Sequence, residues 1–247
     1  MLYLLRAVYL VIHFLVICAY AVLYCLIFPR RLNNNSKLAR MMSWSLPVLG
    51  INHIKKNQSP IAADQPAIYI SNHQDTLDIF LHPNVMPDNI AILGKHSLKY
   101  VPIFGVAFWL AGNIFINRSD RSKAKAALAE VSKTIRERGN SIYMFPEGTR
   151  SRGKGLLPFK KGAFVLAVES GLPIVPVVFS STHKHVDINR WKAGIVLSEF
   201  LDPIDTKGLK PTDINDLLTE CRNQIEQGVE RLDQEVFAMT KQSEAKV

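Results

Sequence analysis

The segment AIYISNHQDTLD at residues 67–78 shows the pattern from which the fold of this chain can be predicted. Its first five residues form a short β-rich run that predicts a buried strand, and polar residues follow at once. Similar β-rich runs lie at residues 90–93, 113–116, 141–145, 174–179 and 195–200, and Pro176 indicates an edge strand or a bulge. Helical periodicity covers residues 120–138, ending before Gly139, and returns from Thr212. Strands that alternate with helices predict an α/β domain with a largely parallel sheet.

The N-terminal region predicts attachment to a membrane. Residues 7–28 are almost wholly apolar, interrupted only by His13, and such a run is long enough to cross a hydrocarbon core of about 30 Å. The triplet AYA at residues 19–21 is similar to a signal-peptide cleavage site. Retention as an anchor is favoured, because the apolar run continues past this triplet and Arg6 is the only early charge.

Residues 29–58 connect the apolar run to the rest of the chain. The polar stretch 29–37 predicts a linker, and residues 38–51 predict an interfacial helix that lies on the membrane without spanning it. Four basic residues place the chain after the first helix on the cytoplasmic side: Arg30, Arg31, Lys37 and Arg40. Whether the first helix spans the bilayer or re-enters it stays open. We therefore divide the chain into N-terminal membrane-anchoring helices at residues 1–58 and an α/β domain at residues 59–247.

The charge of the chain indicates an anionic partner. The net charge is +9, and residues 95–161 alone carry 14 Lys/Arg against 4 Asp/Glu, a net charge of +10. Nucleic acid, an anionic membrane surface or a phosphate-bearing substrate would each suit such a region, and so would a solvated basic face without a partner.

Two common kinds of site are excluded by the sequence. The three cysteines, at positions 18, 25 and 221, form no CxxC pair, so neither a disulfide framework nor a zinc site is expected, and no metal-binding residues are predicted. The stretch from Gly148 to Gly155 begins like a phosphate-binding P-loop, but Gly155 stands where such a loop needs Ser or Thr to hold Mg²⁺. A nucleotide triphosphatase is therefore not expected.

Polar residues with catalytic chemistry follow the strand predicted at residues 67–71. His73 and Asp78 are five residues apart, so they can meet only if His73 lies on the turn before a helix and Asp78 lies in its first turns. There Asp78 would accept a hydrogen bond from Nδ1 of His73 and leave Nε2 free as a general base. A helix-capping Asp near a surface His would give the same spacing, so this pattern alone leaves both interpretations open.

Two further loops carry groups suited to an anion. Arg118 follows the run at residues 113–116, just before the helical pattern, where a guanidinium and a helix N-terminus can bind phosphate. The segment FPEGTRSR at residues 145–152 follows another strand, and Gly148 permits a tight turn whose backbone N–H groups, with Arg150, could face an anion. An exposed arginine after a strand would explain Arg118 equally well.

The order and spacing of these groups resemble the glycerophospholipid acyltransferase family. Its N-H-x-x-x-x-D block is matched by Asn72, His73 and Asp78, its G-x-x-F-I-x-R block by Gly112, Phe115, Ile116 and Arg118, its F-P-E-G-T-R-S block by residues 145–151, and its V-P-V strand by residues 175–177. The motif positions show no departure from the family pattern. The chain length and the N-terminal anchor are similar to those of bacterial members that acylate lysophosphatidic acid.

The resemblance implies a fold, an activity and a location. The fold is the glycerolipid acyltransferase fold, in which a largely parallel or mixed central sheet is flanked by helices and follows an N-terminal helical membrane-anchoring segment. The activity is transfer of a fatty acyl group from acyl-CoA or acyl-acyl carrier protein to the sn-2 hydroxyl of lysophosphatidic acid, giving phosphatidic acid without a further cofactor. The location is the bacterial inner membrane, with the active site on the cytoplasmic face and membrane phospholipid as a partner.

The resemblance also implies roles for the motif residues. His73 would deprotonate the sn-2 hydroxyl while Asp78 orients its ring, and no enzyme nucleophile would be needed. Arg118 and Arg150 would hold the substrate phosphate, with Lys95 as a further candidate. The third block supplies the remaining substrate-binding residues: Glu147, Gly148 and Thr149. Which loop supplies donors for the oxyanion stays open.

Three other functions are compatible with the sequence. A related enzyme would acylate glycerol-3-phosphate or another lysophospholipid, although a short chain without a large extra domain favours lysophosphatidic acid. A hydrolase would use His73 to activate water, but a lipid-covered site that excludes water argues against it. A non-enzymatic basic protein that binds membranes or nucleic acid would have the same charge, but no nucleic-acid motif appears.

Overall fold

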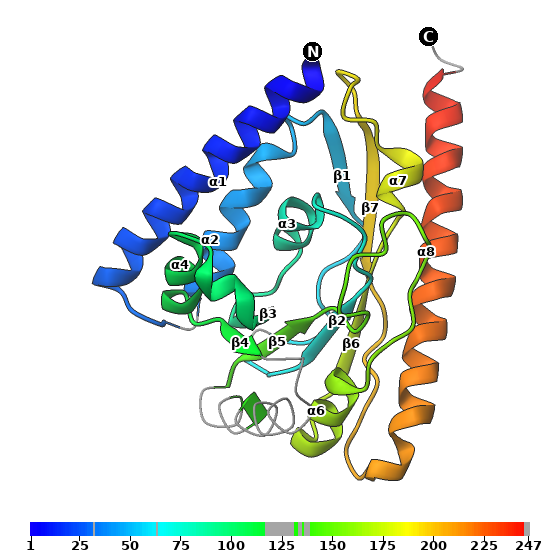
Figure 1. Cartoon of the computed structure of the whole chain (residues 1–247). Coiled ribbons are helices and arrows are strands. Elements are labelled where there is room, and N and C mark those ends of the chain that lie inside the picture. The colour runs from blue at the N-terminus through cyan, green and yellow to red at the C-terminus, as the bar shows by residue number, and fades with distance from the viewer. Residues whose placement is uncertain (32, 63, 117–130, 133–134, 136–138, 245–247) are drawn as a thin grey trace.

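The computed structural model describes the chain except for residues 32, 63, 117–130, 133–134, 136–138 and 245–247. In this described part, seven strands form one sheet in the order β1-β7-β6-β2-β5-β3-β4 (Figure 1). The strands are β1 (Ile51–Lys55), β2 (Ile68–Ser71), β3 (Ile90–Lys95), β4 (Ile114–Ile116), β5 (Ser141–Met144), β6 (Ile174–Phe179) and β7 (Gly194–Phe200). Neighbouring strands pair in parallel except β6 and β7, which are antiparallel. The predicted α/β fold with a largely parallel, mixed sheet is confirmed.

Helices cover both faces of the sheet. One face packs against α1 (Leu2–Ile27), α2 (Asn34–Met42), α3 (Asp78–Leu81) and α4 (Phe104–Leu110), and the other against α6 (Gly162–Ser170) and α8 (Ile214–Glu244) (Figure 1). A short helix, α7 (Thr182–His185), follows β6, and four 3-10 helices complete the described part: η1 (Ser43–Ser45), η2 (His82–Asn84), η3 (His96–Tyr100) and η4 (Pro211–Asp213).

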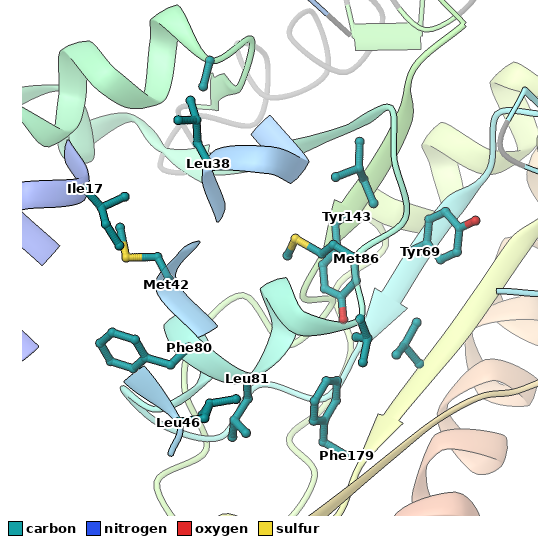
Figure 2. Close-up of a cluster of buried hydrophobic side chains, with 14 of the residues drawn as sticks. Ile17, Leu38, Met42, Leu46, Tyr69, Phe80, Leu81, Met86, Tyr143 and Phe179 are labelled. Carbon is teal, nitrogen blue, oxygen red and sulfur yellow. The ribbon is translucent and has the colours of Figure 1, made fainter. Parts of the chain in front are cut away.

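The two-sided burial of the sheet explains why its central strands are continuous apolar runs. In β2, Tyr69 belongs to the cluster under α1–α4, while Ile68 and Ile70 belong to the cluster under α6 and α8. The rings of Tyr69, Tyr143 and Phe179 project from three strands into the first cluster, where side chains of α2 and α3 meet them (Figure 2). Because parallel strands with both faces covered have no solvent side, they lack the polar alternation of a half-exposed strand.

The strand order brings the candidate loops together. β2 lies between β5 and β6, with Ile70 in register with Met144 on one side and with Pro176 on the other. All three strands run in the same direction, so the loops that leave their carboxyl ends meet at one edge of the sheet. The loop with His73 therefore lies between the loops that follow β5 and β6.

The segment between α1 and the sheet differs from its prediction. The helix expected at residues 38–51 is shorter and starts earlier, because α2 covers Asn34–Met42. It does not continue to residue 51, since Pro47 and Gly50, with φ +70°, lie in the turn that follows η1. Residues 34–36, expected within a linker, are buried, and the Asn35 side chain donates a hydrogen bond to the Ile90 carbonyl. Residues 51–55, of which only Ile51 was expected within that helix, form β1 at the edge of the sheet, ahead of the domain boundary expected at residue 59.

Two other expectations can be compared with the fold. Pro176 was expected to mark an edge strand or a bulge, and the edge alternative is wrong because β6 is a central strand. The pairing around Pro176 is irregular, as in a bulge. Ile174 pairs with Ile204, and the Pro176 carbonyl accepts a hydrogen bond from the N–H of Leu201, so three residues of the partner segment lie opposite two residues of β6. The helix expected at residues 120–138 lies largely outside the described residues. The last helix begins as η4 and α8, as predicted from Thr212.

α1 is held on the domain along its length and exposes an apolar face. The buried guanidinium of Arg6 donates hydrogen bonds to the carbonyls of Val48, Ile188, Arg190 and Trp191. Further along, Ile17, Cys18, Ala21 and Cys25 are buried. The opposite face exposes large apolar side chains: Tyr3, Leu4, Leu5, Val8, Val11, Ile12, Leu15, Val16, Tyr20, Leu23, Leu26 and Ile27. By length and composition α1 could cross a membrane, and so large an exposed apolar face marks an interaction surface.

Candidate active site

His73 and Asp78 meet at the carboxyl end of β2. His73 lies on the turn after the strand, and Asp78 is the first residue of α3. Nδ1 of His73 lies 2.6 Å from Oδ2 of Asp78, and the backbone N–H of Gln74 donates to the same oxygen at 2.7 Å. The five-residue spacing therefore closes across a turn, in the arrangement that the sequence suggested.

The surroundings of this pair set its protonation. Asp78 is 3 % exposed, and burial by itself would raise its pKa, but the hydrogen bond from His73 and the nearby ring of His82 bring the pKa well below its usual range. A charged Asp78 requires that the neutral His73 carry its proton on Nδ1. Nε2 is then the nitrogen left to act on a ligand in the adjoining cavity, which His73 helps to line. The His73 ring stacks on Phe145 at 4.1 Å between centroids, which fixes its plane.

Glu147 links the His73 turn to the loops after β5. Its Oε1 accepts a hydrogen bond from the backbone N–H of His73 at 2.6 Å, and its Oε2 accepts one from the N–H of Leu157 at 3.0 Å. The residue is 2 % exposed, and burial raises the pKa of its carboxyl group although both N–H donors lower it. Both oxygens of the Glu147 carboxylate thus accept hydrogen bonds from backbone N–H groups, so Glu147 supports the His73 turn.

The turn is fixed from both sides by backbone and amide hydrogen bonds. On the β5 side, the N–H groups of Ser151 and Arg152 donate to the carbonyls of His73 and Gln74. On the β6 side, Asn72 exchanges two hydrogen bonds with the backbone of Phe179, each 3.0 Å long. The Gln74 amide donates to the carbonyl of Ser180 and accepts from the N–H of Thr182. A turn held in this way keeps the His73 backbone in one position.

Cationic side chains line the same cavity. Lys95, Arg150 and Arg152 are among its lining residues, as are Gly148 and Thr149. Arg150 is oriented by the Thr76 hydroxyl, which lies 3.4 Å from its Nη1. The structure thus brings the predicted residues Lys95, Gly148, Thr149 and Arg150 to the site of the His73–Asp78 pair, whereas Arg118 lies outside the described residues.

Two basic residues near the site were not singled out from the sequence. Arg152 directly follows the third block, and its position there was a usable signal. Lys160 was not, because only the fold brings it close: its ammonium lies so near Gly148 that a Cβ at that glycine would come within 2.8 Å of Nζ. Gly148 also has φ +71°, which a side chain would disfavour.

The cavity joins this polar end to an apolar interior. Its volume is about 590 Å³. Beyond the dyad and the cationic residues, Asn35 and Asn113 also line the cavity, but most of its walls are apolar. Apolar side chains come from helices on one face of the sheet: Phe14, Ile17, Cys18 and Ala21 of α1, Leu38, Ala39 and Met42 of α2, and Phe104, Ala107 and Phe108 of α4. A ligand with an anionic group at one end and an alkyl chain at the other matches these walls. Among the described residues, no group of three or more His, Cys, Asp or Glu side chains is placed to hold a metal ion.

Replacing Glu147 by glutamine is expected to reduce the free energy of unfolding by about 1–3 kcal/mol, because the amide nitrogen cannot accept a hydrogen bond and leaves one partly buried N–H without a partner. Urea denaturation would measure the loss. Glu169→Gln is the matched control, since Glu169 is exposed on α6. Equal stability of the two variants would contradict the role assigned to Glu147.

The comparisons with known proteins agree on one family. The sequence profile described as Acyltransferase matches residues 52–180. The chain is 39 % identical over 236 residues to the 1-acyl-sn-glycerol-3-phosphate acyltransferase of Escherichia coli (strain K12), covering 96 % of each protein. It is also 39 % identical to the protein of that name from Haemophilus influenzae, covering 96 % of this chain and 98 % of the relative. The fold is similar to the crystal structure of the 1-acyl-sn-glycerophosphate (LPA) acyltransferase PlsC from Thermotoga maritima, with a TM-score of 0.67, 24 % sequence identity and coverage of 94 % and 98 %.

Proposed function

We propose, from the premise that this chain belongs to the Acyltransferase family, that it transfers a fatty acyl group to the sn-2 hydroxyl of 1-acyl-sn-glycerol-3-phosphate and so produces phosphatidic acid. The acyl donor is a thioester, acyl-CoA or acyl-acyl carrier protein. The observation that carries the proposal is the 2.6 Å contact between His73 and Asp78 at the cationic end of an apolar cavity. Its family relatives are named for the same reaction.

The geometry suits a direct transfer. Nε2 of His73 accepts the proton of the sn-2 hydroxyl while its oxygen attacks the carbonyl carbon of the thioester, and Asp78 stabilises the imidazolium that forms. The tetrahedral intermediate then collapses, the C–S bond breaks, and His73 returns its proton to the thiolate. One ester bond forms and one thioester bond breaks, so no enzyme nucleophile, oxidant or further cofactor takes part.

The binding of the substrate follows from the two ends of the cavity. Arg150, with Arg152 and Lys95, offers charge-assisted hydrogen bonds to the phosphate of the acceptor, and Arg118 is a further proposed ligand of the same phosphate. Alkyl chains of acceptor and donor would occupy the apolar part between α1, α2 and α4, where burial of each CH₂ contributes about 0.8 kcal/mol.

Substrate and product are membrane lipids, so the protein needs a route to the bilayer. The exposed apolar face of α1 supports attachment to a membrane. α1 and α2 also form part of the cavity wall, so a lipid-covered α1 would bring the cavity close to the acyl chains of the bilayer. We place the enzyme on the inner membrane of a bacterium, with its site on the cytoplasmic face.

An acceptor panel tests the proposed reaction. Purified protein in phospholipid vesicles receives oleoyl-CoA or oleoyl-acyl carrier protein with one acceptor at a time: lysophosphatidic acid, glycerol-3-phosphate, lysophosphatidylethanolamine or none. Lysophosphatidic acid should be acylated faster than the other acceptors, and phosphatidic acid should form only when lysophosphatidic acid is present. A faster reaction with another acceptor, or release of free fatty acid at the full rate without an acceptor, would refute the proposal.

Arg150→Ala is expected to raise the KM for lysophosphatidic acid about tenfold, the value of roughly one charge-assisted hydrogen bond at a partly exposed site. The KM for the acyl donor should change less than twofold. Lys207→Ala is the control, because Lys207 is exposed and does not line the cavity. If the donor KM rises instead, Arg150 does not hold the acceptor phosphate.

A further inference from the structure

A second imidazole lies directly beneath the catalytic carboxylate. His82 is 1 % exposed and lies one helical turn after Asp78. Its Nε2 lies 3.7 Å from Oδ1 of Asp78, and neither of these buried atoms has a hydrogen-bond partner among the described residues. The other carboxylate oxygen, Oδ2, is engaged twice, by His73 and by the N–H of Gln74. The two oxygens of Asp78 therefore face two different imidazole rings.

Tyr143 fixes which way the His82 ring points. The Tyr143 hydroxyl lies 2.7 Å from Nδ1 of His82, which turns Nε2 toward Asp78. Aromatic rings enclose the rest of the imidazole, with the Phe179 centroid at 4.0 Å and the Phe145 centroid at 4.9 Å. In such an enclosure the ring cannot rotate away without displacing its neighbours.

The proton of His82 belongs on Nε2. Burial lowers the pKa of His82, so the ring is neutral near pH 7, and burial raises the pKa of Tyr143, so its hydroxyl keeps the proton that it donates to Nδ1. The alternative tautomer would turn the lone pair of Nε2 toward the negative Oδ1 of Asp78, which is unfavourable in a site of low dielectric. An N–H group is thus directed at the unpartnered carboxylate oxygen.

We propose that His82 is a positioning residue, whose Nε2–H holds Oδ1 of Asp78 and so keeps Oδ2 aligned with Nδ1 of His73 during acyl transfer. The inference rests on the proposed function and extends it beyond the His73–Asp78 pair. A carboxylate held by one oxygen alone can rotate about its Cβ–Cγ bond, whereas a donor on each oxygen restricts that rotation. At 3.7 Å the N–H already acts on Oδ1 in the free enzyme, and the separation shortens further when the reacting complex forms, as long catalytic hydrogen bonds commonly do.

The charged and titratable groups around His82 are few. Asp78 faces it on its own helical segment, and Asp75 contributes a second negative charge from the preceding loop. From β1, His53 lies near it, but burial, followed by the nearby His82 and Lys55, lowers the pKa of His53 to about 4. From β5 and β6 the neighbours are Tyr143, Phe145 and Phe179. His73, on the other side of Asp78, is the remaining titratable group whose charge acts on His82.

The test compares His82→Leu with His82→Gln. Leucine removes both nitrogens at similar volume, and kcat should fall about tenfold, a common coupling within one hydrogen-bond network, while the KM for lysophosphatidic acid stays within about twofold. Oδ1 would lose the N–H that faces it, so the carboxylate would favour the protonated form of His73 more strongly. The acidic limb of the pH profile of kcat/KM should therefore move to higher pH. Glutamine restores an N–H donor and should recover most of kcat.

A matched pair of tyrosines separates this role from packing. Tyr143→Phe removes the hydroxyl that orients His82 and should move kcat and the pH profile in the same direction as His82→Leu. Tyr69 stacks on Tyr143 at 6.5 Å, but its hydroxyl pairs with Ser59 and points elsewhere (Figure 2), so Tyr69→Phe should leave both unchanged. Thermal unfolding confirms that each variant is folded. A folded His82→Leu with the kcat and pH profile of the unmodified protein would overturn the proposal, and so would a His82→Gln variant as slow as His82→Leu.

A measurement without substrate distinguishes this inference from the proposed function. The proton between Nδ1 of His73 and Oδ2 of Asp78 should give a far-downfield proton NMR resonance, which moves in His82→Leu and does not move in Tyr69→Phe. If the resonance behaves in this way but lysophosphatidic acid is not acylated, the proposed function fails and the positioning role stands. If lysophosphatidic acid is acylated and the resonance is the same in His82→Leu, the positioning role fails alone.

Discussion

His73→Ala is expected to lower the turnover of phosphatidic acid formation by ~10²–10⁴-fold, the usual contribution of a positioned general base. In the proposed mechanism, the variant lacks the nitrogen that takes the proton of the sn-2 hydroxyl and the cation that later protonates the thiolate. The KM values for both substrates should change little, because the imidazole contributes mainly in the transition state. Steady-state kinetics in vesicles of one lipid composition measure both quantities.

The control for His73→Ala is His183→Ala, since His183 is an exposed imidazole that does not line the cavity. This control should keep normal turnover. Thermal unfolding should show that His73→Ala is folded, because the backbone N–H of His73 still donates to Glu147. A folded His73→Ala variant that retains more than about one tenth of the turnover would exclude His73 as the base.

Asp78→Asn is expected to lower turnover by ~10³–10⁴-fold, comparable with the loss when the aspartate of a serine-protease triad is changed in the same way. Oδ2 of Asp78 accepts hydrogen bonds from both His73 and the N–H of Gln74. An asparagine amide group at that position would donate to Nδ1 of His73, or would accept from it without the negative charge. When the amide donates, the proton of His73 is favoured on Nε2, and Nε2 can then no longer act as a base.

Two comparisons make the Asp78→Asn result specific. The double variant His73→Ala/Asp78→Asn should be no slower than the slower single variant, because the two residues act as one unit. Asp202→Asn, at an exposed carboxylate outside the cavity lining, should be as active as the unmodified protein. If the effects of the two single changes multiply, Asp78 acts independently of His73 and the orienting role is wrong.

The sequence predicted the central strands well because they are buried on both faces. β2, β5 and β6 are fully buried, so their residues form uninterrupted β-rich runs. β1 was missed because it lies at the edge and contains Asn52, His53 and Lys55. Its pairing partner, β7, comes more than a hundred residues later, at Gly194–Phe200. Local composition carries no information about that pairing.

The candidate site was predictable where its residues are close in sequence. His73 and Asp78 lie on one turn and its following helix, so their spacing alone suggested the contact. Glu147 contacts the N–H of His73 across 74 residues, and Gln74 contacts the loop after β6 across more than a hundred. His82 becomes visible only through its partner Tyr143, which is 61 residues away. These contacts depend on the order β6-β2-β5 within the sheet, which the sequence pattern did not determine.

The fate of a labelled acyl group tests the central claim most directly. The protein, in vesicles, is incubated with oleoyl-CoA labelled in the acyl group, first alone and then with lysophosphatidic acid. Direct transfer by His73 predicts no label on the protein before the acceptor is added, and label in phosphatidic acid afterwards. Label bound covalently to the protein, or recovered mainly as free oleic acid when lysophosphatidic acid is present, would contradict the account.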